Sequence, residues 1–262
     1  MPLIEIEGSR VHYAERPGGK RAVVFLHGGF GSSSELWART MAALPPQYSA
    51  YAIDNFLRSD PPPDGYSVSE FARRVGGFIA AMGLQRPVLV GHSMGGVTVQ
   101  LAAIRFPDRV GGLVLVCTGP AMTNHAAARR WLEELRDHGH RYETIRDISA
   151  NWFHRPVPEF FQGYVDRAAC APLQAMVDVQ ASLIETDLRA RLGEIRCPAL
   201  VVWGKHDTGR TMEHAQALLD GIPNSTFAPM NDSGHSPMVE TPQDFDAAFH
   251  TFLASIQEGV RT

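Results

Sequence analysis

Residues 88–96 read Val-Leu-Val-Gly-His-Ser-Met-Gly-Gly and contain the pattern G-x-S-x-G, centred on Ser93. An apolar run over 87–91 predicts a strand before the serine, and the spacing over 94–106 predicts a helix after it. So sharp a turn strains the serine backbone, and the flanking glycines remove side chains that would clash. We therefore predict that the Ser93 hydroxyl projects at a helix N-terminus, where the dipole favours developing negative charge. A tight turn without chemistry is the alternative.

Apolar strand-like runs and helical patterns alternate on both sides of this motif. The runs are short and continuous in apolar character, which is typical of parallel strands covered on both faces. We therefore predict an α/β fold that begins with a hairpin and continues with parallel strands. The expected strands are 3–6, 11–14, 22–26, 51–54, 87–91, 110–117, 198–203 and 225–229, and the expected helices are 34–44, 68–82, 94–106 and 241–256.

Residues 120–192 differ from the rest, because they carry helical patterns and many aromatic side chains but no convincing strand. We interpret this stretch as a helical cap inserted over the carboxyl edge of the sheet, with 1–119 and 193–262 forming the core. The aromatic side chains either line a site for an apolar substrate or pack the cap itself. They are Trp131, Trp152, Phe153, Phe160, Phe161 and Tyr164.

A serine hydroxyl is a poor nucleophile unless a base accepts its proton and an acid orients that base. Asp207 follows one strand-like run, and His235 follows the last such run. The chain order serine, acid, histidine is the one expected for a serine on a turn of this kind. We therefore predict Ser93 as nucleophile, His235 as general base and Asp207 as orienting acid. Asp232 is a competing acid, but it follows no strand.

A glycine-rich segment, 26–31, follows another strand-like run and reads Leu-His-Gly-Gly-Phe-Gly. An oxyanion needs N–H donors aimed at empty space, and glycines let the backbone come close. We predict the backbone N–H groups of Gly29 and Met94 as these donors, and a structural role for His27. The segment does not match a nucleotide-binding pattern. No metal-ligand set is evident, so we expect no metal and no cofactor.

The bulk composition indicates a globular chain that acts on a small molecule. Its 262 residues are 44% hydrophobic and carry a net charge of −4, so no basic excess exists to meet nucleic-acid phosphates. Three scattered cysteines do not make a disulfide framework, which fits a reducing compartment. No signal peptide or membrane-length apolar run is evident. We expect a cytoplasmic protein with a small-molecule substrate and no nucleic-acid or membrane partner, and we leave a homo-oligomer open.

Four segments together resemble the α/β-hydrolase superfamily, and most closely its bacterial esterases, non-haem haloperoxidase-like proteins and carbon–carbon bond hydrolases. They are Leu-His-Gly-Gly-Phe-Gly, Gly-His-Ser-Met-Gly-Gly, Trp-Gly-Lys-His-Asp and Ser-Gly-His-Ser-Pro, at 26–31, 91–96, 203–207 and 233–237. The resemblance covers nearly the whole chain and implies a mostly parallel, eight-stranded sheet with a helical cap. A nucleophilic serine separates the chain from the similar dehalogenases and epoxide hydrolases, which use aspartate.

Residues 53–60 depart from the family, because relatives usually carry a Gly-x-Gly in this stretch and both glycines are missing here. Asn55 and Phe56 in this loop either project toward the substrate or pack under the cap. We count six candidate substrate contacts, which are Phe30, Asn55, Phe56, His92, Trp131 and Trp152.

The function that we expect is acyl transfer from a small, largely apolar ester to water, through an acyl-enzyme. The same three residues would also serve carbon–carbon bond, lactone or thioester hydrolysis. Carbon–carbon cleavage calls for polar cap residues such as Arg155, Gln162 and Arg167, and the tryptophan that those relatives often carry after the histidine is Ser236 here. A non-hydrolytic lyase or a small-molecule binder is the third alternative, which a complete catalytic set disfavours.

Overall fold

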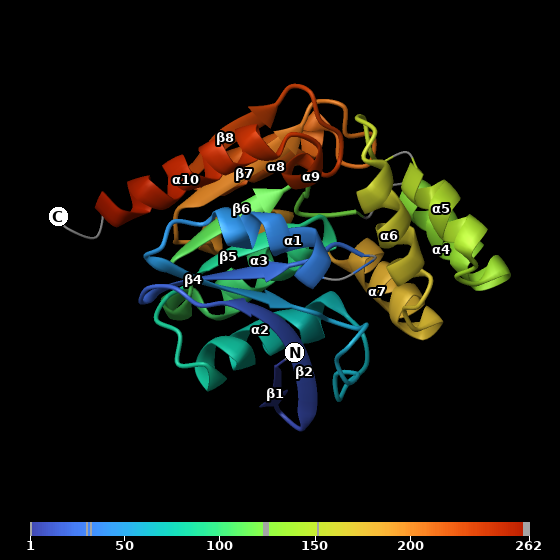
Figure 1. The fold of residues 1–262 in the computed structure, drawn as a ribbon, viewed down its shortest axis with the longest axis horizontal. Coiled ribbons are helices and arrows are strands. Elements are labelled where there is room, and N and C mark those ends of the chain that lie inside the picture. The colour runs from blue at the N-terminus through green and yellow to red at the C-terminus, as the bar shows by residue number, and fades with distance from the viewer. Residues whose placement is uncertain (1, 30, 32, 123–125, 151, 259–262) are drawn as a thin grey trace.

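The computed structural model describes residues 2–29, 31, 33–122, 126–150 and 152–258, and an eight-stranded sheet runs through it (Figure 1). The strand order is β1-β2-β4-β3-β5-β6-β7-β8. The pairs β1–β2 and β2–β4 are antiparallel, and all other pairs are parallel. This confirms the predicted mostly parallel sheet. Its strands are β1 Leu3–Ile6, β2 Ser9–Arg16, β3 Arg21–Leu26, β4 Tyr48–Ile53, β5 Val88–His92, β6 Gly112–Val116, β7 Ala199–Gly204 and β8 Ser225–Met230.

Helices cover both faces of the sheet, because successive side chains of a strand point to opposite faces. In β3, Val23 and Phe25 join the apolar layer of α1 and α10, whereas Val24 and Leu26 join the layer of α2 and α3. Both layers are buried, which explains why the strand sequences are apolar without interruption. The helices of the core are α1 Ser33–Ala43, α2 Val68–Ala81, α3 Met94–Arg105, α8 Met212–Gly221, α9 Pro237–Glu240 and α10 Pro242–Glu258, with a 3-10 turn at Pro107–Arg109.

The loop that follows β4 is held from within by Asp54. This fully buried carboxylate accepts hydrogen bonds from the Ser33 N–H at 2.7 Å and from Arg58 Nη1 at 3.0 Å, and His12 Nδ1 lies 2.7 Å from it. Arg74 of α2 donates to two backbone carbonyl oxygens of the loop, both at 2.8 Å. The loop that lacks the family's glycines is therefore fixed by charged hydrogen bonds to three neighbouring elements.

Four helices stand between β6 and β7 in the stretch predicted as the cap. They are α4 Ala126–His138, α5 Tyr142–Ala150, α6 Pro158–Ala168 and α7 Leu173–Glu185, followed by a 3-10 helix at Arg189–Glu194. Figure 1 shows α4 to α7 grouped at one end of the sheet. The division into a core of 1–119 and 193–262 and a cap of 120–192 stays a prediction.

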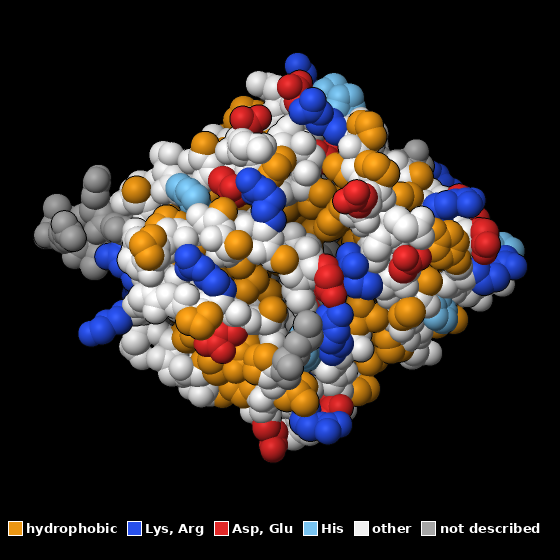
Figure 2. All heavy atoms as spheres, viewed as in Figure 1, with side chains coloured by type: hydrophobic (Ala, Val, Ile, Leu, Met, Phe, Trp, Pro, Cys, Tyr) orange, Lys and Arg blue, Asp and Glu red, His pale blue; other side chains and the backbone are white. Residues whose placement is uncertain are grey.

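The surface carries charges of both signs. Acidic and basic side chains are interspersed over the face shown in Figure 2, without a large patch of one sign. None of the described helices combines the length and the apolar character that a membrane span requires.

Candidate active site

Ser93 lies on a strained turn between β5 and α3, as its sequence context predicts. Its backbone angles are φ 53° and ψ −115°, in a region that side-chain-bearing residues rarely adopt. A Cβ at Gly91 would stand 2.3 Å from the Gly95 carbonyl oxygen, and one at Gly95 would stand 2.5 Å from the His27 carbonyl oxygen. The two glycines are thus required by close backbone approach. The Ser93 N–H donates to the Val116 carbonyl oxygen at 3.0 Å, which fixes the turn to β6.

Asp207 and His235 form a buried pair, although 27 residues separate them in the sequence. His235 Nδ1 lies 2.7 Å from Asp207 Oδ2. The other carboxylate oxygen, Oδ1, accepts the backbone N–H groups of Gly209 and Arg210, each at 2.8 Å. Burial alone would raise the pKa of Asp207, but attraction to His235 and these hydrogen bonds outweigh it and lower that pKa. The carboxylate is therefore ionised and oriented at neutral pH.

The backbone of His235 is held on both sides. Its N–H donates to the carbonyl oxygen of Trp152 in the cap at 2.8 Å. On the other side, His92 Nε2 lies 2.8 Å from the His235 carbonyl oxygen. Burial and repulsion from His235 lower the pKa of His92 to about 3, so its ring is neutral and Nε2 donates this hydrogen bond. His92, adjacent to Ser93, therefore positions the loop of His235.

Glu240 fastens the same loop to the cap. Its buried carboxylate accepts the N–H groups of Gly234 and Ser236, which flank His235, at 3.1 Å. It also accepts the N–H groups of His154 and Arg155 at 2.7 and 2.9 Å. One side chain thus joins the segment before α6 to the segment that carries the candidate base.

Ser93 and His235 line one small cavity, of about 30 Å³, between the sheet and the cap. That volume has room for about one or two water molecules. Core and cap both contribute apolar walls, and the polar lining consists of few groups. The described lining residues are Gly29, Ser93, Met94, Met122, Trp131, Trp152, Gln180, Leu183, Gly209, Arg210 and His235.

Both predicted oxyanion donors belong to this cavity. Gly29 and Met94 line it beside Ser93. Within the described residues, neither backbone N–H is engaged in a hydrogen bond. Met94 opens helix α3, so its N–H also benefits from the positive end of the helix dipole. The two groups are available for an oxygen that develops negative charge.

The predicted substrate contacts divide into two groups. Trp131 and Trp152 line the cavity, with ring centroids 5.4 Å apart and the Trp152 ring 5.7 Å from that of His235. Phe30 lies outside the described residues. Asn55, Phe56 and His92 are absent from the described lining of the cavity, and their contact with a substrate stays a prediction.

Phe56 and Asn55 pack against other residues of the core. Phe56 is buried against the rings of His27 and Phe71, with centroids at 4.7 and 6.0 Å. Asn55 is fully buried, and its N–H donates to His27 Nε2 at 3.0 Å. His27 Nδ1 in turn lies 2.7 Å from the Gly28 carbonyl oxygen, in line with the structural role predicted for this histidine.

The geometry of the site also bears on Asp232, the competing acid, and on carbon–carbon bond cleavage, the competing reaction. Asp232 is exposed to solvent, whereas Asp207 reaches the histidine. None of Arg155, Gln162 and Arg167 lines the cavity. The polar cap groups that carbon–carbon cleavage calls for are therefore not supplied by these residues.

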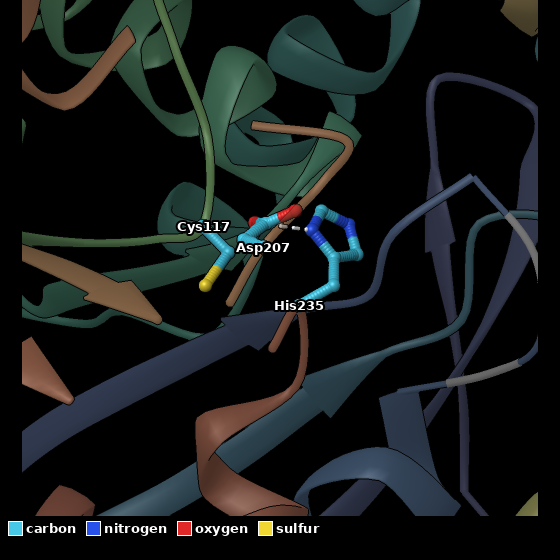
Figure 3. Close-up of side chains that lie close together, drawn as sticks. All are labelled: Cys117, Asp207 and His235. Atoms are coloured by element: carbon cyan, nitrogen blue, oxygen red, sulfur yellow. Dashed lines mark hydrogen bonds and ion pairs between the residues drawn. The ribbon is translucent and has the colours of Figure 1, made fainter. Parts of the chain in front are cut away.

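Cys117 completes the surroundings of the pair. Its Sγ, an Asp207 oxygen and a His235 nitrogen all lie within 4.8 Å of one another, as Figure 3 illustrates, and no other group of this kind occurs among the described residues. Burial raises the pKa of the Cys117 thiol well above its usual value, so the sulfur stays protonated and is a poor metal ligand. The pair Asp207–His235 is already mutually engaged.

Among the residues of this site that were not anticipated from the sequence, three have charged or amide side chains. Arg210 and Gln180 line the cavity, and Glu240 holds the histidine loop. The only signal for Arg210 is its position three residues after Asp207. A glutamate five residues after the histidine gives no sign of its role, because the role depends on where the cap docks.

Comparisons with known proteins show the family to which the chain belongs. Residues 23–248 match the model of a family described as alpha/beta hydrolase. A 2-hydroxy-6-oxo-6-phenylhexa-2,4-dienoate hydrolase of Comamonas testosteroni is 29% identical, over 93% of this chain and 91% of its own length. A pimeloyl-[acyl-carrier protein] methyl ester esterase of Edwardsiella ictaluri is also 29% identical, over 89% and 93%.

A solved structure shares the fold. An esterase from Exiguobacterium antarcticum superposes with a TM-score of 0.87 and 21% identity, over 97% of this chain and 98% of its own. At that identity the likeness concerns the arrangement of helices and strands alone.

Proposed function

Because this chain belongs to the alpha/beta hydrolase family, we propose that it is a serine hydrolase that cleaves a carboxylic ester-type bond through an acyl-enzyme. One observation carries the proposal: Ser93 and His235 line the same cavity, while Asp207 engages Nδ1 of His235 at 2.7 Å. With Nδ1 occupied, Nε2 is the nitrogen left to accept the serine proton.

The reaction follows from these positions. Ser93 Oγ attacks the ester carbonyl carbon as its proton passes to His235 Nε2, and Asp207 stabilises the imidazolium. The N–H groups of Gly29 and Met94 donate to the carbonyl oxygen, which becomes negative. The carbon–oxygen bond to the alcohol then breaks, and the alcohol leaves with the proton from His235. Water, deprotonated by His235, attacks the acyl-enzyme and releases the acid and free Ser93.

The walls of the cavity support a substrate with a small, largely apolar body. Met122, Trp131, Trp152 and Leu183 present apolar surface to the space beside Ser93. One relative at 29% identity is named a methyl ester esterase. Another at the same identity is named a dienoate hydrolase, so carbon–carbon cleavage is the second candidate. A panel of short esters, lactones, thioesters and vinylogous diketones separates the two.

The first prediction concerns the reacting residues. Ser93→Ala should lower kcat on 4-nitrophenyl butyrate by about 10⁴-fold or more, because the nucleophile is gone. Asp207→Asn should lower it by about 10³- to 10⁴-fold, because the histidine tautomer is no longer fixed. A fluorophosphonate probe should label the wild type at Ser93, as read by peptide mass spectrometry.

Asp232→Asn is the matched control for Asp207→Asn. It removes an exposed carboxylate near the same histidine and should change kcat by less than about twofold. The mechanism would be contradicted if the probe left Ser93 unmodified in the folded protein. It would also be contradicted if Ser93→Ala kept full turnover.

A further inference from the structure

Arg210 is a buried cation whose two terminal guanidinium nitrogens have no hydrogen-bond partner among the described residues. The residue is 2% exposed, and its backbone holds Asp207 and Trp203 in place. Yet its Nη1 and Nη2 are both buried and make no hydrogen bond with any described residue. Guanidinium groups are almost never buried without an acceptor, because desolvation of the charge is expensive. The arrangement therefore calls for an acceptor that the described residues do not supply.

Asp207 does not supply that acceptor. Its Oδ2 is engaged by His235, and its Oδ1 by two backbone N–H groups. No ion pair within 4.0 Å joins its carboxylate to the Arg210 guanidinium, although the two groups attract each other over a longer distance. Asp207 is thus committed to orienting the histidine.

None of the described residues that line the cavity of Arg210 carries a carboxylate. Among its described lining residues, Arg210 is the one charged side chain apart from the titratable His235. The amide of Gln180 is turned to the Ala128 carbonyl oxygen, at 3.2 Å. Burial lowers the pKa of Arg210 only to about 10, so the group is cationic at neutral pH. A positive charge that no described carboxylate contacts directly therefore borders the space beside Ser93.

We propose that Arg210 is a specificity residue that binds a carboxylate of the substrate, so that the ester cleaved at Ser93 belongs to a molecule with a free acid group. A planar carboxylate offers two acceptor oxygens to the forked Nη1 and Nη2 donors, and a charged pair formed out of water is strong. The apolar walls then contact the part of the substrate between the acid and the ester. This inference rests on the proposed function and narrows its substrate class.

Matched pairs of esters test the proposal. Mono-4-nitrophenyl glutarate is compared with its terminal amide, and 3-acetoxybenzoate with 3-acetoxybenzamide, so that the acid is on the acyl side in one pair and on the alcohol side in the other. In at least one pair the wild type should prefer the acid by about 10- to 100-fold in kcat/KM. Arg210→Met should reduce that ratio to about one, and Arg210→Lys should retain part of it.

Arg189→Met is the matched control, because it removes an exposed arginine that is paired with Asp187. It should leave the acid-to-amide ratio unchanged. A wild type that prefers neither acid overturns the proposal without any variant, as does a preference that Arg210→Met leaves intact.

A binding measurement separates this proposal from the proposed function. In the Ser93→Ala variant, butyrate should raise the melting temperature more than butyramide does, and Arg210→Met added to that variant should abolish the difference. Equal shifts of the melting temperature with butyrate and with butyramide would count against the binding of a carboxylate by Arg210. If none of the four esters is turned over and the probe leaves Ser93 unlabelled, the result counts against the hydrolase mechanism. That conclusion does not depend on whether Arg210 binds a carboxylate.

Discussion

At the scale of single residues, the site depends on two neighbouring histidines with different partners. His235 lines the cavity, and its Nδ1 lies 2.7 Å from the carboxylate of Asp207. His92, in contrast, is fully enclosed, and its neutral ring donates to the backbone of that same loop. Two imidazoles with centroids 4.7 Å apart can therefore act as base and as support, because their surroundings differ.

The buried neutral state of His92 makes stability depend on pH. Its folded pKa, about 3, is depressed below the unfolded value of about 6.5, so its contribution is complete above 6.5 and is lost as pH falls toward 3. In that window the unfolded chain binds a proton that the folded chain does not. Over this range the contribution of His92 to the free energy of unfolding should fall by about 1.4 kcal/mol for each unit by which the pH is lowered. Urea unfolding between pH 4 and 7 measures the slope.

His92→Gln tests the assignment, because its side-chain amide keeps a donor and does not titrate in this range. The variant should show a slope that is smaller by about 1.4 kcal/mol per pH unit. Identical slopes for the wild type and the variant would mean that other groups cause the acid sensitivity.

The sequence indicates reacting residues better than supporting ones. Ser93, Asp207 and His235 follow from residue type, strand ends and chain order. His92 was a candidate contact because it adjoins Ser93, and Asn55 and Phe56 because their loop departs from the family, but the side-chain direction at a turn is set by tertiary packing. An arginine is expected at the surface by default, so the burial of Arg210 could not be foreseen.

At the scale of elements, helix α9 is short but holds the candidate base in place. It ends at Glu240, whose carboxylate accepts N–H groups from the histidine loop and from the segment before α6. Four backbone donors depend on this one side chain, and the two at Gly234 and Ser236 are buried and would otherwise lack a partner. Cap docking and the position of His235 are therefore coupled through it.

Glu240→Gln keeps the size of the side chain but replaces one acceptor oxygen by a donor. We expect a loss of about 1–3 kcal/mol in the free energy of unfolding. We also expect a fall of about tenfold in kcat and in the rate of fluorophosphonate labelling of Ser93, because His235 is less well oriented. Denaturant titration and labelling kinetics measure the two effects.

Glu213→Gln, at an exposed position of α8, is the control and should change stability by less than about 0.5 kcal/mol. Lost stability in Glu240→Gln with labelling at the wild-type rate would show a purely structural role for Glu240.

Elements with broad apolar surfaces were predictable, and those with narrow ones were not. The strands that the helices cover on both faces read as continuous apolar runs, so their existence was evident. Helix α8 was not predicted, because only Ala215 and Leu218 of its residues are buried and so thin a stripe gives little periodic signal. β2 extends to Arg16, beyond the predicted 11–14, because it pairs with β4 as well as with β1.

At the scale of the whole molecule, the cavity beside Ser93 is too small for an ester substrate. About 30 Å³ of space cannot hold a molecule of several carbon atoms, so we expect the cap to move when a substrate enters. The contacts between core and cap that could yield include the Val68 N–H to Ser182 Oγ hydrogen bond at 3.1 Å and the Arg167–Glu35 pair at 4.0 Å.

Hydrogen exchange should reveal this movement. We expect the amides of α4 to α6 to exchange at least about tenfold faster than those of β3, β5 and β6, because the cap opens without unfolding the sheet. A phosphonate bound covalently at Ser93 should slow exchange in the same helices. Equal exchange in cap and strands, with or without the phosphonate, would contradict entry through cap movement.

The indole of Trp152, 5.7 Å from the imidazole of His235 and 5.4 Å from the indole of Trp131, has an optical consequence. An imidazole close to an indole quenches its emission, and the quenching weakens as the two rings separate. Fluorescence intensity should therefore rise, without any added dye, when the stretch that carries Trp152 moves away from His235. The molecule thus carries a built-in light signal for the opening of its own cavity.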